Sequence, residues 1–151
     1  MEECIFCKYA NNPDTCHKIW EDEEHLAFLS IFPNTEGFSV VIPKVHYPSY
    51  VFNLEDEVFH KLMTASREVA RLIDSKLDDV GRTGMILEGF GIDHVHTKLF
   101  PMHKTASNPK WEPIISHVDK YFEKYEGYIS SHDYVRAEDK TLEKLARKIR
   151  S

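Results

Sequence analysis

Two histidines and a lysine alternate with other residues along positions 94–98. Because alternate side chains of a β-strand lie on the same face, His94, His96 and Lys98 are expected to project together. An imidazole is largely neutral and nucleophilic near neutral pH, and a lysine ammonium offers a positive charge to an anionic substrate. Burying three such groups is costly without a purpose, so this face is a candidate reaction site. The alternative interpretation is a solvated strand face of polar residues.

Two cysteines near the start of the sequence form a second candidate site. Cys4 and Cys7 are separated by two residues, a spacing typical of half a metal site, and Cys16 is the third cysteine. The first residues are acidic and lack a long apolar run, so no secretory signal peptide is expected. An odd number of cysteines without such a signal argues against a disulfide framework. We therefore expect a protein of the cytoplasm.

The composition restricts the classes of partner. The 151 residues carry a net charge of −6, so a broad nucleic-acid surface is not expected and an anionic substrate must meet a local positive patch. No stretch approaches the roughly 20 apolar residues of a membrane span. The sequence contains no Walker-type glycine loop, which excludes an ATPase of that class.

Four strands and two helices are expected to position the candidate residues. Apolar and alternating runs predict the strands, of which the first two form a hairpin, over residues 25–31, 38–42, 82–89 and 94–100. Helical spacing of apolar residues predicts a long helix from its cap at Asn53 to about residue 77, and a terminal helix over 138–150. This order favours an α+β fold, with one helix packed on an antiparallel sheet of about five strands and a C-terminal helical tail.

Four segments, taken in order along the chain, resemble the histidine triad (HIT) family. They are the Cys-x-x-Cys pair, an apolar strand, a strand that ends in Pro-Lys-x-His, and a His-x-His pair, at residues 4–7, 26–31, 37–46 and 94–96. The resemblance implies a HIT-like fold, which we expect to occupy residues 1–113. Residues 114–151, which the resemblance does not cover, are expected to form a C-terminal extension that packs on the same domain. Two positions depart from the family motif, because Lys98 replaces a third histidine and Thr97 an apolar residue.

The resemblance implies that His96, the middle histidine of the motif, attacks the α-phosphorus of a nucleotide. A phosphohistidine intermediate would form and water would then hydrolyse it. The expected enzyme is a hydrolase or nucleotidyl transferase acting on a nucleoside phosphoramidate or a dinucleoside polyphosphate. Lys98 would supply positive charge to this reaction, with a simple salt bridge as the equal alternative. A non-catalytic, zinc-containing nucleotide-binding or scaffold protein with the same fold is the alternative function.

The resemblance also implies a structural zinc ion held by Cys4, Cys7, His46 and His94. These residues would give zinc four protein ligands, which is the pattern of a closed structural site. The alternative is a pair of reduced thiols beside a histidine that binds no metal. His103, which is followed by Lys104 and Lys110, is a weaker candidate for a substrate contact.

A nucleotide pocket is implied beside the reactive strand. The base would lie against apolar residues that could instead belong to the core: Ile5, Phe6, Tyr9, Phe28 and Ile31. Ser30 stands where family members carry an acid that holds the ribose hydroxyls, and Gly91 where they carry a polar phosphate contact. Phe90 could stack on the base or fill the core.

Family members commonly form homodimers, so the resemblance implies a homodimer here as well. The region after residue 110 is rich in aromatic side chains, which could pack over the sheet or reach the partner's active site. These aromatic residues are Trp111, Tyr121, Phe122, Tyr125, Tyr128 and Tyr134.

Overall fold

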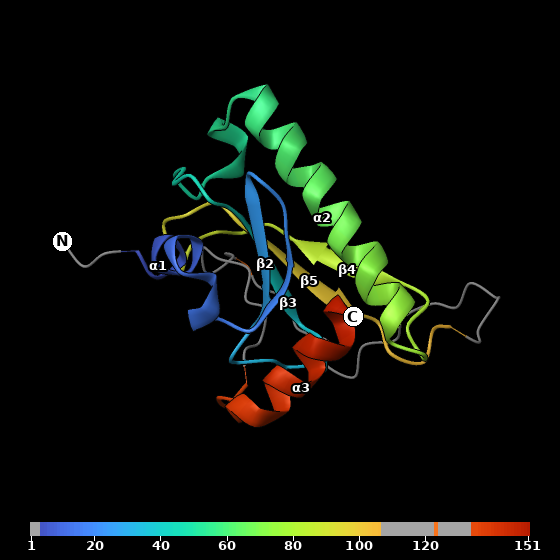
Figure 1. Ribbon diagram of the computed structural model, residues 1–151. Coiled ribbons are helices and arrows are strands. Elements are labelled where there is room, and N and C mark those ends of the chain that lie inside the picture. Colours follow the sequence, from blue (N-terminus) through green and yellow to red (C-terminus); the bar gives the residue numbers. More distant parts are fainter. Residues whose placement is uncertain (1–3, 107–122, 124–133) are drawn as a thin grey trace.

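The computed structural model describes residues 4–106, 123 and 134–151. Five antiparallel strands form one sheet in the order β1-β2-β3-β5-β4 (Figure 1). Their bounds are Lys18–Glu21 (β1), His25–Leu29 (β2), Ser39–Pro43 (β3), Thr83–Ile86 (β4) and Thr97–Pro101 (β5). The helices are Ile5–Asn11 (α1), Asp56–Lys76 (α2) and Asp139–Arg150 (α3), with single 3-10 turns at Pro13–Thr15 (η1) and Val51–Asn53 (η2). The expected α+β class and five-stranded sheet are confirmed.

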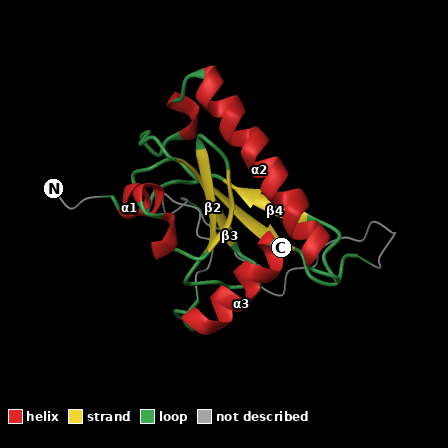
Figure 2. Cartoon of the chain, viewed as in Figure 1, coloured by secondary structure: helices red, strands yellow, loops and turns green. Residues whose placement is uncertain are grey.

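The central strands are buried on both faces, because helices cover both sides of the sheet (Figure 2). β2 and β3 pair along their whole length, as expected for a hairpin. Ala27 and Leu29 point into a cluster shared with α2 and α3, whereas Leu26 and Phe28 pack against α1. This alternation explains why the sequence of β2 is almost continuously apolar.

The long helix α2 lies across one face of the sheet and presents the predicted apolar stripe. Leu62, Ala65, Val69 and Ile73 are buried along it. The predicted cap at Asn53 is wrong, since that residue ends η2 and the helix begins only after Glu55. Val51 is buried in the core and draws the chain into a separate turn before the helix starts.

Two elements in the first 21 residues were not predicted. The segment at residues 8–18 is mostly polar, and it shows no clear helix or strand pattern. However, α1 extends through its first part and β1 begins at its end. α1 has only seven residues and β1 only four, too few to show a clear hydrophobic period. Phe6 and Ile19 are their buried anchors.

The strand predicted over residues 94–100 begins three residues later, at Thr97. The alternation nevertheless extends upstream, because Val95 points into the cluster below α2 while His94 and His96 meet the Phe6 ring on the other face. Thr97 has a polar partner on the helix side, where its Oγ1 lies 2.8 Å from Ser66 Oγ of α2. That buried contact accounts for a threonine at a position expected to be apolar.

The terminal helix α3 packs against β1 and α2 (Figure 1). Leu142, Ala146 and Ile149 bury one side of it in the same core as α2. Tyr134 is exposed, and the other aromatic residues of the tail lie outside the described residues. The proposed boundary at residues 113–114 also lies outside them. None of the helices in the described part of the chain combines the length and apolar character needed to cross a lipid bilayer.

Candidate functional site

His96 is held in one orientation by the backbone just before β5. Its Nδ1 lies 2.7 Å from the carbonyl oxygen of His94. Because a carbonyl oxygen can only accept, Nδ1 carries the proton and Nε2 keeps its lone pair. The acceptor of this proton is therefore the backbone carbonyl two residues upstream.

The surroundings of His96 favour its neutral form. The side chain is almost fully buried, and the edge of the Phe6 ring packs against it with ring centroids 5.1 Å apart. Burial lowers the pKa of His96 below its ordinary value, and the nearby Lys98 ammonium lowers it further. The His94 carbonyl and the Glu88 carboxylate oppose this effect without reversing it. The imidazole is therefore suited to act as a nucleophile at neutral pH.

Lys98 forms an ion pair with Glu88, and both side chains are largely buried. The second carboxylate oxygen of Glu88 accepts a hydrogen bond from the Phe90 backbone at 2.9 Å. Although burial raises the pKa of Glu88, the hydrogen bond from Lys98 and that from Phe90 hold it below its ordinary value. Lys98 therefore forms a salt bridge and also lies near His96. The salt-bridge interpretation is thus compatible with a role in supplying positive charge to the site.

His96 and Lys98 open into a cavity of about 430 Å³. Its walls include most of the residues that sequence reasoning assigned to a nucleotide: Ile5, Phe6, Tyr9, Phe28, Ser30, Ile31 and Gly91. Phe90 is not among the lining residues, and its side chain is 78% exposed. Aromatic side chains such as Phe6 and Phe28 make one region of the cavity apolar. His96 and Lys98 make another region polar and basic.

Several cavity residues were missed by sequence reasoning. Glu88 lies ten positions before its partner Lys98, and no periodic pattern connects the two. Arg136 and Asp139 come from the segment that leads into α3, and His17 comes from the stretch before β1. The packing of α3 onto the sheet brings Arg136 and Asp139 to the site, so no local sequence signal pointed to them.

His103 lies outside the cavity and fastens a loop. Its Nδ1 is 3.0 Å from the Asp79 carboxylate and its Nε2 is 2.8 Å from the Glu36 carbonyl. The hydrogen bonds that His103 donates to these two acceptors, together with the Asp79 charge, outweigh burial and raise the pKa of His103. Both ring nitrogens are therefore engaged in structure, and Lys110, its supposed partner, lies outside the described residues.

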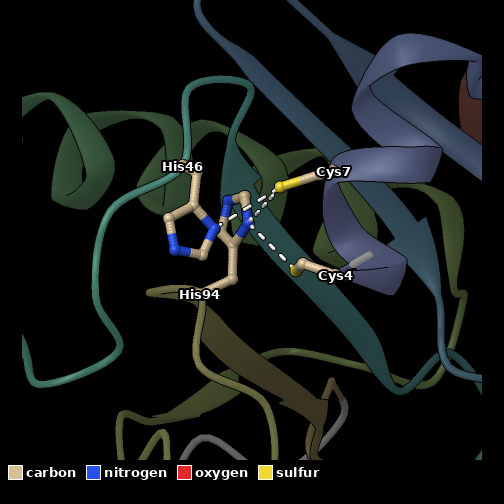
Figure 3. A group of neighbouring side chains, drawn as sticks. All are labelled: Cys4, Cys7, His46 and His94. Atoms are coloured by element: carbon tan, nitrogen blue, oxygen red, sulfur yellow. Dashed lines mark hydrogen bonds between the residues drawn. The ribbon is translucent and has the colours of Figure 1, made fainter. Parts of the chain in front are cut away.

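Four potential metal ligands converge near the start of α1 (Figure 3). The ligand atoms of Cys4, Cys7, His46 and His94 all lie within 4.8 Å of one another. Cys7 Sγ is 3.4 Å from His46 Nδ1 and 3.6 Å from His94 Nδ1, and Cys4 Sγ is also 3.6 Å from His94 Nδ1. The two cysteines come from the start of α1, and the two histidines from the loops that follow β3 and precede β5.

These distances fit a tetrahedral zinc ion. Bonds of about 2.3 Å to sulfur and about 2.0 Å to nitrogen place a sulfur and a nitrogen ligand about 3.6 Å apart. His94 Nε2 donates to the Pro43 carbonyl at 2.9 Å, so its Nδ1 lone pair points at the thiols. A histidine fixed by such an outer hydrogen bond is the usual form of a zinc ligand. The residues present therefore suit zinc in a site with four protein ligands.

Comparison with known proteins agrees with this architecture. A family model described as HIT domain matches residues 11–105. The protein hit of Bacillus subtilis is 32% identical over 106 residues, which cover 68% of this chain and 72% of that protein. Adenosine 5'-monophosphoramidase hnt1 of Schizosaccharomyces pombe is 34% identical over 99 residues, covering 65% of this chain and 73% of that protein.

The three-dimensional fold has solved counterparts as well. The crystal structure of a Zn-bound histidine triad family protein from Mycobacterium smegmatis superimposes with a TM-score of 0.67 at 19% identity, over 98% of this chain and 91% of that one. The implied HIT-like fold is therefore confirmed. With a domain match over well more than half of its residues, the chain belongs to the HIT family.

Proposed function

We propose that this protein is a nucleotide hydrolase or nucleotidyl transferase that acts on nucleoside phosphoramidates through His96. The observation that carries the proposal is the buried imidazole of His96 at a cavity wall, with its Nδ1 proton directed to the His94 carbonyl. This arrangement leaves the lone pair of Nε2 available to attack the phosphorus of a substrate. A relative named adenosine 5'-monophosphoramidase supports the choice of phosphoramidates over dinucleoside polyphosphates.

The proposed reaction has two displacements at phosphorus. His96 Nε2 forms a bond to the α-phosphorus while the bond from phosphorus to the leaving amine breaks, and the amine leaves with an added proton. Lys98, whose ammonium lines the cavity, is the residue assigned to donate that proton and to stabilise the negative charge. Water then breaks the phosphorus–histidine bond, releases the nucleoside monophosphate and returns a proton to Lys98.

The apolar part of the cavity is assigned to the base. Phe6, Tyr9 and Phe28 form a cluster of rings with centroids 5.1–6.4 Å apart. Such a surface binds the faces of a flat heterocycle by dispersion and exclusion of water. Since Phe6 also touches His96, a base against these rings leaves the α-phosphate near the nucleophile.

Zinc is proposed as a structural partner of α1. Four protein ligands leave no coordination position for a substrate, so the ion would hold the start of the chain against the sheet and take no part in the reaction. The reduced thiols that such a site needs are consistent with the cytoplasm. A homodimer remains part of the proposal, and sedimentation equilibrium of the purified protein would test it.

Turnover assays with a matched histidine variant test the function. Wild-type protein is incubated with adenosine 5'-phosphoramidate and with a diadenosine polyphosphate, beside His96→Ala and His60→Ala. His60 is an exposed residue of α2, so its variant should keep full activity. His96→Ala should lose activity by about a thousandfold or more, because the nucleophile is gone. Binding of AMP without turnover of either substrate would favour the non-catalytic alternative.

A further inference from the structure

The cavity beside His96 has a polar wall that the C-terminal part of the chain provides. Arg136 and Asp139 line this wall together with His17. The Ala137 backbone N–H donates to the Ile31 carbonyl at 2.8 Å, which fixes the segment against the loop after β2. Arg136 and Asp139 lie beyond the end of the HIT domain match at residue 105.

Asp139 presents an ionised carboxylate to the cavity. Its Oδ1 accepts hydrogen bonds from Arg136 Nη2 at 2.9 Å and from His17 Nε2 at 3.0 Å. Arg136 makes a second bond, to Oδ2, at 3.2 Å. The hydrogen bond from Arg136 and then that from His17 lower the pKa of Asp139. Two carboxylate oxygens offer about four lone-pair sites, so Oδ2 can still accept a hydrogen bond from a ligand.

The core of the protein fixes the position of this carboxylate. Asp139 is the first residue of α3, whose buried residues Leu142 and Ile149 anchor it beside α2. At the far end of the helix, Arg150 donates to the Lys18 carbonyl of β1 at 2.7 Å. A group carried on a packed helix needs little ordering when a ligand binds.

The other carboxylate of the cavity is less accessible. Within the described residues this is Glu88, whose two oxygens bind Lys98 and the Phe90 backbone. The side chain of Glu88 is only 9% exposed, whereas that of Asp139 is 63% exposed. Asp139 is therefore the carboxylate that a substrate in the cavity can reach more easily.

We propose that Asp139, supported by Arg136, binds the ribose hydroxyls of the nucleotide and makes the site selective for ribonucleotides. This inference rests on the proposed function. The two hydroxyls of a ribose donate hydrogen bonds. A carboxylate that is ionised at neutral pH accepts them more strongly than a neutral group does. The guanidinium of Arg136 can donate hydrogen bonds to the same hydroxyl oxygens. Asp139 and Arg136 together therefore match the ribose hydroxyls both as donors and as acceptors. A 2',3'-dideoxynucleotide would offer no hydroxyl to the carboxylate of Asp139 or to the guanidinium of Arg136.

Equilibrium binding of AMP and 2',3'-dideoxy-AMP tests the inference without requiring turnover. Calorimetry is carried out on wild type, on Asp139→Ala and on Glu143→Gln. Glu143 is a matched control, because it lies on the same helix and also approaches His17, at 3.7 Å, but is not among the residues that line the cavity. Wild type should bind AMP about tenfold or more tightly than the dideoxy analogue. Asp139→Ala should reduce this preference to within about twofold, and Glu143→Gln should keep it.

The ratio of the two affinities separates binding from a purely structural role. If Asp139 only fastened α3, its loss would weaken both ligands equally and leave the ratio unchanged, which would overturn the inference. A wild-type protein that ignores the ribose hydroxyls, or does not bind AMP, would overturn it as well. Loss of the preference in Asp139→Ala together with absence of turnover would instead contradict the enzyme proposal while the ribose site stands.

Discussion

His94 serves both parts of the site through different atoms. Its backbone carbonyl holds the proton of His96, and its ring Nδ1 faces the thiols of Cys4 and Cys7. The ring Nε2 is fixed by the Pro43 carbonyl. A backbone acceptor cannot be removed by a side-chain substitution, so the orientation of His96 is robust to changes at neighbouring positions. The candidate metal ligands and the proposed nucleophile are therefore adjacent, and His94 contributes different atoms to each.

Removing the charge of Lys98 should slow the chemical step. Lys98→Met keeps much of the side-chain length but removes the ammonium, and kcat for adenosine 5'-phosphoramidate should fall by about a hundredfold. Lys61→Met is the control, because Lys61 forms exposed ion pairs with Glu24 and Glu57 and none of the three lines the cavity. Steady-state kinetics of both variants checks this expectation, and unchanged kcat in Lys98→Met would show that the lysine is only structural.

The residues of the reactive face were predictable, but their partners were not. Alternation along residues 94–98 was enough to group His94, His96 and Lys98, because the period of a strand is a local property. Glu88 and Asp139 reach the same cavity from a loop and from a helix 41 positions beyond Lys98, which no local pattern encodes. The departure from the family motif at Lys98 indicated a change in the site. That Glu88 supplies the carboxylate paired with Lys98 could be established only from the structure.

At the scale of elements, α1 depends on contacts beyond its own hydrogen bonds. It has only seven residues, and helices of that length are not stable alone in water. Phe6 packs against Phe28 on the sheet, and Cys4 and Cys7 lie among the metal ligands. Because these anchors are tertiary, the sequence predicted the cysteine pair but not the helix that contains it. β1 was missed for a related reason, since it is a four-residue edge strand.

Substituting one thiol should release the zinc ion and loosen α1. Cys7→Ser removes a thiolate ligand, so protein purified without added zinc should fall from about one equivalent of zinc to a small fraction of it. The melting temperature should fall as well, because binding of a structural metal contributes to folding. Mass spectrometry of the metal content and thermal melts measure both quantities.

Cys16→Ser provides the comparison for this experiment. Cys16 is outside the ligand set, and its thiol donates to the Pro13 carbonyl, a bond that a serine hydroxyl can also make. This variant should retain its zinc. Wild-type protein that contains almost no zinc would contradict the proposed site.

On the scale of the whole molecule, the HIT segment and the C-terminal helix fold around one core. Residues of α3 are buried in the same cluster as α2 and the central strands. The terminal helix was predicted from its apolar spacing, and the apolar residues Leu142, Ala146 and Ile149 are buried in this core. What the helix contributes to the cavity could not be predicted, because that depends on how α3 is docked.

A cavity in the α3 interface should destabilise the whole protein. Ile149 is fully buried, so Ile149→Ala should lower the free energy of unfolding by about 2–4 kcal/mol. Lys144→Ala, an exposed substitution on the same helix, should change it by less than about 0.5 kcal/mol. Urea denaturation followed by circular dichroism compares them. A first transition confined to α3, with the remainder unaffected, would contradict a shared core.

The central claim is that His96 becomes covalently bound to the nucleotide. Wild-type protein is mixed rapidly with adenosine 5'-phosphoramidate, quenched at neutral or alkaline pH and examined by intact-mass and peptide mass spectrometry. The account predicts a transient addition of one adenylyl group, located on His96 and absent from His96→Ala. Turnover without such an adduct, or an adduct located on another residue, would contradict it.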